Sequence, residues 1–98
     1  MTGERIRIDK WLWHARFYRS RVQAQEAAAS GLLRVNGLRV ERSSVGVQPG
    51  DVVTVPRGRD VVAVRIEAVA LRRGPSTEAR KLYSVIESSR LDPAAPAS

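Results

Sequence analysis

Apolar residues near the N-terminus recur with the period of an α-helix. Ile8, Leu12 and Ala15 fall on one helical face, so their spacing predicts a short helix. Asp9 is suited to be its N-cap, and the helix is expected to run to about Phe17. The polar residues before it, up to position 5, are expected to fray.

A second helix is predicted to begin at Ser20. Ser20 and Gln23 form a Ser-x-x-Gln capping box, a common helix start. The alanine-rich run at 24–29 continues the helix and favours close packing against a neighbour. Gly31 is expected to end it, because glycine adopts the left-handed conformation beyond the last turn without strain.

Beyond the second helix the pattern changes to a period of two. The segments 33–35 and 38–40 alternate apolar and polar residues on either side of Asn36-Gly37. This dipeptide is the strongest two-residue hairpin signal, because both positions of the turn need a positive φ. We therefore predict a β-hairpin centred on it.

Two further strands are predicted after the hairpin. A loop at 43–48 and a Pro49-Gly50 turn lead into a strand at 51–55, which Pro56 closes. After a basic turn, a longer strand is expected over about 61–71.

The C-terminal part is predicted to return to helix. Gly74-Pro75 ends the long strand, and Ser76 or Thr77 is expected to cap a final helix. The apolar stripe of that helix would be Ala79, Leu82, Tyr83 and Ile86. The predicted fold class is α+β: two N-terminal helices, a small mostly antiparallel sheet and a C-terminal helix packed on it. One domain is expected over 1–91, with a disordered tail at 92–98.

Charge narrows the range of functions. The 98 residues carry a formal net charge of +7. Such an excess indicates a polyanionic partner, either nucleic acid or an anionic membrane surface, unless it is spread evenly for solubility. The sequence has no cysteine, which excludes disulfides, and its one histidine, His14, cannot form a histidine metal site alone. The sequence has neither a signal peptide nor an apolar run of spanning length, so a cytoplasmic protein without membrane contact is expected. The protein is also expected to be a monomer.

The basic excess is concentrated in the first part of the chain. Residues 1–42 contain nine basic and four acidic residues, a net charge of +5, whereas the remainder carries +2. Arg16, Arg19 and Arg21 bracket the turn between the predicted helices. Arg21 lies at a helix N-terminus, where backbone amides already favour a phosphate. Nucleic-acid binding is therefore favoured over an evenly solubilising surface.

Four residues of the first helix have structural interpretations. Asp9 is expected to orient Arg7 or Arg21 rather than to act as a catalytic carboxylate. Trp11 and Trp13 lie two positions apart and so point to different helix faces. We expect Trp11 to be buried and Trp13 to be partly exposed. His14 is expected at the surface or in a hydrogen bond, without a catalytic role.

These residues together resemble a known family. The opening Arg7-Ile8-Asp9-Lys10-Trp11-Leu12-Trp13, then Ser20-Arg21, Val35-Asn36-Gly37 and Pro49-Gly50-Asp51, resembles the S4-type (alpha-L) RNA-binding domain over about residues 7–56. Within that superfamily, the opening and the continuation from Ala15 to Arg21 look most like the bacterial ribosome-associated heat-shock protein family.

The resemblance implies a function and a set of contacts. A helix pair and a hairpin would present one basic face to folded ribosomal RNA, and the heat-shock relatives are expected to bind a free large ribosomal subunit that still carries a nascent chain. No cofactor, metal or catalytic residue is expected. The predicted RNA-binding residues are Arg7, Lys10, Arg16, Arg19, Ser20, Arg21, Gln25, Asn36 and Arg39.

Three other functions remain open at the level of sequence. Two short helices joined by a tight turn are also typical of a DNA-binding helix-turn-helix protein. An RNA-binding accessory subunit of an RNA-modifying enzyme is a second alternative, although no phosphate loop, metal cluster or nucleophile–base pair indicates catalysis within this chain. An adaptor that binds protein through a sheet edge is a third.

Overall fold

The computed structural model describes residues 5–70 and 72–90. The helices are α1 (Ile8–His14), α2 (Arg21–Ala29) and the single turn α3 (Ser76–Ala79), which continues into the 3-10 turn η1 (Arg80–Leu82). The strands are β1 (Ile6–Arg7), β2 (Arg34–Val35), β3 (Leu38–Arg39), β4 (Gly46–Val47), β5 (Val52–Arg57), β6 (Asp60–Ile66) and β7 (Tyr83–Arg90).

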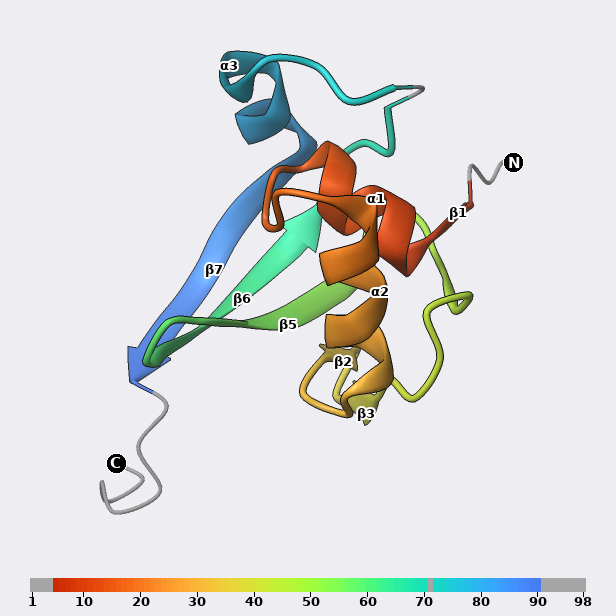
Figure 1. The fold of residues 1–98 in the computed structure, drawn as a ribbon. Helices are drawn as coiled ribbons and strands as arrows, with labels where there is room; N and C mark the ends of the chain where they lie inside the picture. Colours follow the sequence, from red (N-terminus) through yellow and green to blue (C-terminus); the bar gives the residue numbers. More distant parts are fainter. Residues whose placement is uncertain (1–4, 71, 91–98) are drawn as a thin grey trace.

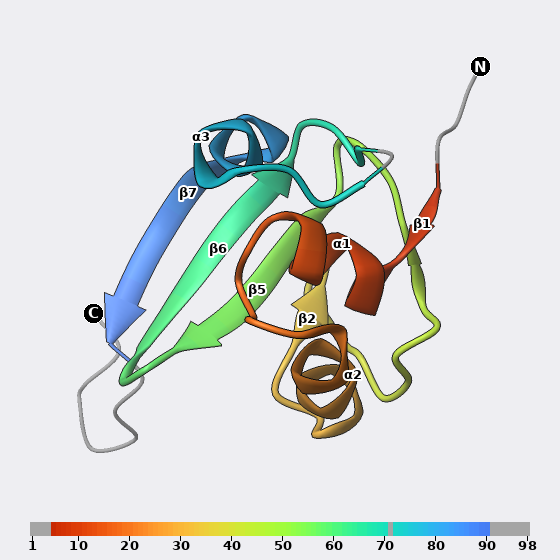
Figure 2. The ribbon, with the colours of Figure 1, turned by 45° about the horizontal axis from the view of Figure 1, so that its top comes forward.

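The main sheet is antiparallel, with five strands in the order β3-β2-β5-β6-β7. A second, two-stranded ribbon pairs β1 with β4. Helices α1 and α2 lie on one side of the sheet, and the β5–β6 turn lies away from both of them (Figures 1 and 2). The predicted α+β class is confirmed.

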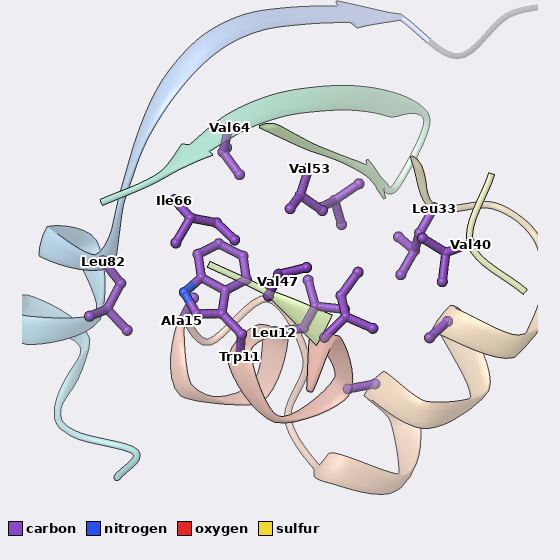
Figure 3. Close-up of a cluster of buried hydrophobic side chains, with 14 of the residues drawn as sticks. Trp11, Leu12, Ala15, Leu33, Val40, Val47, Val53, Val64, Ile66 and Leu82 are labelled. Atoms are coloured by element: carbon purple, nitrogen blue, oxygen red, sulfur yellow. The ribbon is translucent and has the colours of Figure 1, made fainter. Parts of the chain in front are cut away.

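The core lies between the two helices and the sheet (Figure 3). Trp11 is completely buried there beside Leu12 and Ile66, and its indole Nε1 donates a hydrogen bond to the Ala68 carbonyl at 3.0 Å. A buried indole N–H needs such a partner, because an unpaired one costs about 1–3 kcal/mol. Trp13 is only half-buried. The contrast predicted between the two tryptophans is confirmed.

The second helix begins and ends as predicted. Ser20 is the N-cap of α2, and its hydroxyl accepts the Gln23 N–H at 3.1 Å. Gly31, with φ +83°, follows the C-cap Ser30. Ala24 and Ala28 are buried, so the small side chains of this helix do face the core.

The first helix differs from its prediction at both ends. Its N-cap is Arg7, without a side-chain cap, and Asp9 lies inside the first turn, so the N-cap assigned to Asp9 is wrong. The helix ends at His14 rather than near Phe17. The Phe17 N–H bonds the Leu12 carbonyl and the Arg16 N–H bonds the Trp13 carbonyl, which is the Schellman pattern of a helix end.

The predicted hairpin is present as β2 and β3. Asn36 and Gly37 have φ values of +52° and +83°, as a two-residue primed turn requires. The Asn36 side chain fastens this turn to the following strand: Nδ2 donates to Asp51 Oδ1 at 3.1 Å, and Oδ1 accepts the Val52 N–H at 2.9 Å. The Asn-Gly and Gly-Asp motifs of the sequence are therefore one connected structure.

The β1–β4 ribbon was not predicted. Ile6 pairs with Val47 and Arg7 with Gly46, where the sequence indicated no strand at 6–7 and a loop at 43–48. Each strand has only two residues, which is too short for an alternating pattern to be recognised. Their pairing requires segments some forty residues apart to meet.

The C-terminal prediction is wrong in its main element. The helix that begins at Ser76 ends after one turn with Pro75 as its N-cap, and Tyr83–Arg90 forms strand β7 along the edge of β6. The strand predicted to reach residue 71, which is outside the described residues, ends at Ile66. Pro56 lies within β5 rather than after it, at a position where β2 no longer pairs with that strand. The predicted tail at 92–98 is also outside the described residues.

Arg16 holds a position in the α1 Schellman end where glycine is usual, with φ +64°. A residue with a Cβ in this conformation costs about 1–2 kcal/mol relative to a right-handed one. We expect Arg16→Gly to be more stable than Arg16→Ala by about 1 kcal/mol, because both lose the guanidinium and only alanine keeps the strain. Urea unfolding of the two variants measures the difference, and equal midpoints would contradict it.

Candidate nucleic-acid interface

A buried carboxylate organises the start of the two helices. Asp9 is completely buried, and it accepts hydrogen bonds from Arg7 Nε at 3.2 Å and Arg7 Nη2 at 3.1 Å. Arg21 Nε lies 3.7 Å from the same carboxylate, within ion-pair distance. The backbone N–H of Lys10 donates to Asp9 at 2.7 Å. Asp9 therefore orients both Arg7 and Arg21, as the sequence predicted for one or the other.

Both arginines keep a free surface. The side chains of Arg7 and Arg21 are 47% and 38% exposed, although Asp9 itself is buried. Arg7 comes from β1 and Arg21 from the first turn of α2, so two distant elements contribute to one cationic site. The carboxylate offsets one of their two charges, and the pair retains a net positive charge that faces solvent.

The turn between the helices carries the next group of predicted residues. Arg16 is exposed, and its Nε donates to the Gly74 carbonyl at 2.9 Å, which ties the turn to the loop before α3. Arg19 is exposed, and its backbone N–H bonds Gln23 Oε1 at 3.2 Å. In the described part of the chain, neither arginine has a carboxylate within ion-pair distance. They are consequently available to an external anion.

A buried histidine lies below this surface. His14 is 1% exposed and its Nδ1 lies 3.5 Å from the Val69 carbonyl, so a surface position is wrong and a hydrogen-bonded one is confirmed. Burial lowers the pKa of His14, and the positive charges of Lys10, Arg21 and Arg73 lower it further, against the opposing Val69 hydrogen bond. Lys10, Arg21 and Arg73 are therefore all near enough to His14 for their charges to act on its pKa.

Arg73 joins this group from the loop before α3. Its Nε donates to the Trp13 carbonyl at 3.0 Å, and its guanidinium carbon lies 5.5 Å from the centroid of the Trp13 ring. Such a cation–π contact both holds the arginine and keeps it near the surface. The sequence carries no local signal for this contact, because it joins residues sixty positions apart.

Three more of the predicted RNA-binding residues, Asn36, Arg39 and Gln25, lie in the hairpin and in α2. Both ends of the Asn36 amide are engaged with Asp51 and Val52, so its side chain serves the fold first. Arg39 is exposed, and its guanidinium lies against Gly31 at the end of α2, where a Cβ would come within 2.7 Å of Arg39 Nε. Gln25 is half-buried rather than fully solvated. Arg39 thus extends the surface beyond α2.

Two features of the site were missed in the sequence. Arg5 was expected to fray, yet its guanidinium lies over Gly46 of the β1–β4 ribbon. Ser43 was assigned to a loop, yet its hydroxyl lies 3.4 Å from Arg7 Nη2 and its carbonyl accepts the Asp9 N–H. Both contacts depend on the position of residues 43–47 beside β1.

Residues 5–70 and 72–90 contain no group of three or more histidine, cysteine or acidic side chains placed to hold a metal ion. None of the helices in this part of the chain has the length and apolar character needed to cross a bilayer.

Removal of the Asp9 charge is expected to destabilise the fold. Asp9→Asn leaves Arg7 and Arg21 without their counter-ion and should lower the free energy of unfolding by about 2 kcal/mol, since both arginines are partly solvated. Glu26→Gln, on an exposed acid of α2, is the control with the same charge change. Urea denaturation measures both, and equal stabilities would contradict the role of Asp9.

The fold is expected to lose stability in mild acid through His14. Because its folded pKa lies below the ordinary 6.5, the unfolded chain binds the proton more readily. Neutral, buried His14 therefore contributes its full stabilisation of the fold above about pH 6.5. This stabilisation declines as the pH falls through the lowered pKa of His14. Unfolding at pH 7.5 and pH 5.5 should differ less in His14→Gln than in the natural chain. If the natural chain and His14→Gln lost the same stability between pH 7.5 and pH 5.5, this role of His14 would be contradicted.

Comparisons with known proteins agree on one family. Residues 6–53 match the S4 domain family. Heat shock protein 15 of Escherichia coli K12 is 38% identical over 78 residues, which are 80% of this chain and 58% of that protein. The match thus spans little more than half of that relative's length. The RQC P-site tRNA stabilizing factor of Bacillus subtilis is 31% identical over 86 residues, 88% of this chain and 98% of that protein.

A solved structure extends the likeness to the fold. The trimeric structure of Vibrio cholerae heat shock protein 15 superposes with a TM-score of 0.80 at 36% identity, over 85% of this chain and 83% of that one. Sequence and structure point to the same relatives. The chain therefore belongs to the heat shock protein 15 family of S4-domain proteins.

Proposed function

We propose that this protein binds structured RNA without catalysing a reaction, through a basic face built on α1, α2 and the hairpin. The observation that carries the proposal is the Asp9 cluster, which holds Arg7 and Arg21 in place while both remain partly exposed. Pre-ordered arginines bind phosphate with less loss of side-chain entropy than free ones. The proposed contacts are Arg7, Lys10, Arg16, Arg19, Ser20, Arg21, Gln25, Asn36 and Arg39.

The proposed target is ribosomal RNA of the large subunit, in ribosome rescue under stress. The relatives support this choice: two are heat shock proteins 15, and the Bacillus subtilis relative is by name a factor that stabilises P-site tRNA. Sedimentation of the tagged protein with separated ribosomal subunits tests the target. The proposal requires cosedimentation with the large subunit and RNA crosslinks to the basic face, and exclusive binding to the small subunit would overturn it.

The structure disfavours DNA reading by α2. A recognition helix directs polar side chains at base edges, whereas α2 buries Ala24 and Ala28 and exposes Val22 and the acidic Glu26. The acidic side chain would also repel phosphates. A competition assay separates the two functions: duplex DNA at an equimolar level should not displace structured RNA from the protein.

Binding is expected to depend steeply on salt. Neutralisation of about five phosphates gives a slope of log K against log salt near −4 to −5. Arg19→Ala should weaken binding to large subunits and flatten this slope by about 1, because Arg19 has no ion pair among the described residues.

Arg59→Ala is the matched control for net charge. Arg59 is exposed in the β5–β6 turn, away from α1 and α2 (Figures 1 and 2), so its loss should leave the slope unchanged. Equal effects of the two substitutions would mean that the total charge, and not this face, determines binding.

A further inference from the structure

A pocket of about 370 Å³ lies between the hairpin and the β1–β4 ribbon. Its apolar lining includes Val35, Leu38 and Val45, and its positive charge comes from Arg5 and Arg39. Leu38 is 74% exposed, the highest value among the large apolar side chains of the described chain. A volume of this size is in the range of small-molecule sites. An apolar wall beside two cations suits a ligand that is both planar and anionic.

The Arg5 guanidinium offers a stacking surface at this pocket. It lies over Gly46, where a Cβ would be 3.2 Å from Nε and 3.7 Å from Cζ. Because glycine has no side chain, the guanidinium can approach the backbone on one side. Unstacked RNA bases commonly stack on arginine planes of this kind.

Asp51, the acidic residue of the pocket lining, indicates where a base and a phosphate would lie in the pocket. Asp51 lines the pocket, and its two carboxylate oxygens each accept one hydrogen bond, from Asn36 Nδ2 and from the Gln48 N–H. Its charge repels a phosphate, but a carboxylate oxygen can accept a further N–H from a base edge. A phosphate is therefore favoured beside Arg5 and Arg39, with the base inside.

We propose that this pocket receives one unstacked nucleobase of the bound RNA, with the adjoining phosphate held by Arg5 and Arg39. The inference rests on the proposed function and deepens it. The pocket continues the basic face, because the Arg5 guanidinium lies against Gly46, and Gly46 pairs with Arg7 in the ribbon. Arg7 in turn belongs to the Asp9 cluster. A strand of RNA on that cluster can thus reach the pocket.

The first test removes the apolar wall without changing the charge. Leu38→Ala should weaken binding to isolated large ribosomal subunits at least about fivefold, because it removes apolar surface that the base would bury, and the salt slope should not change. Leu32→Ala is the matched control, since Leu32 is 61% exposed and does not line the pocket. If the natural chain binds and both variants bind equally well, the pocket proposal is overturned while RNA binding stands.

The second test does not depend on the ribosome. Amide NMR spectra of the full chain are recorded with AMP, CMP, GMP or UMP, and separately with inorganic phosphate at equal concentration. Nucleotides should shift the amides of 35–40 and 45–51, and less so in Leu38→Ala, whereas phosphate alone should shift them much less than the nucleotides do. Equal shifts with phosphate alone, or nucleotide shifts confined to the turn at 16–21, would overturn the proposal even if the subunits are bound.

Discussion

The buried carboxylate of Asp9 connects the parts of the molecule on which both fold and surface depend. A carboxylate removed from water is costly unless hydrogen bonds and opposite charges replace the solvent. Here Arg7, Arg21 and the Lys10 amide supply them, and the Ser43 carbonyl accepts the Asp9 N–H. These groups come from β1, α1, α2 and the segment before β4. The α1–α2 pair and the ribbon therefore meet at a single charge.

This arrangement makes the basic face a consequence of the fold. Arg7 and Arg21 cannot leave their positions without exposing or unpairing Asp9, so their charges stay fixed before any ligand arrives. The turn that follows carries a local cost, because Arg16 holds the left-handed conformation at a helix end where glycine is usual. The bond from Arg16 Nε to the Gly74 carbonyl ties this turn to the loop before α3, and the side chain remains exposed.

In the hairpin, by contrast, a predicted contact residue also holds the fold together. Asn36 is a predicted contact by resemblance, and both ends of its amide also hold the turn to Asp51 and Val52. The same Asp51 then lines the pocket with Leu38 and Arg39. A residue that orders the hairpin can thus set the chemistry of the space beside it, while its neighbours supply the exposed contacts.

Short-range features of this protein were determined by its sequence alone. The Ser20 cap, the Gly31 stop and the Asn36-Gly37 turn each depend on residues within a few positions of one another, and all three are present. The Asp9–Arg7 contact and the contrast between Trp11 and Trp13 also follow from spacing along one helix and its flank. The concentration of charge before residue 43 likewise follows from the sequence alone, and it indicated where the proposed interface lies.

Only the tertiary structure decided the rest, because it depends on contacts between distant segments. Ile6 pairs with Val47, and Tyr83–Arg90 becomes a strand because the free edge of β6 offers hydrogen bonds that a short amphipathic segment cannot obtain alone. His14 is buried because the chain near Val69 passes over it. Local preference is weak in such segments, and the partner that arrives determines the conformation.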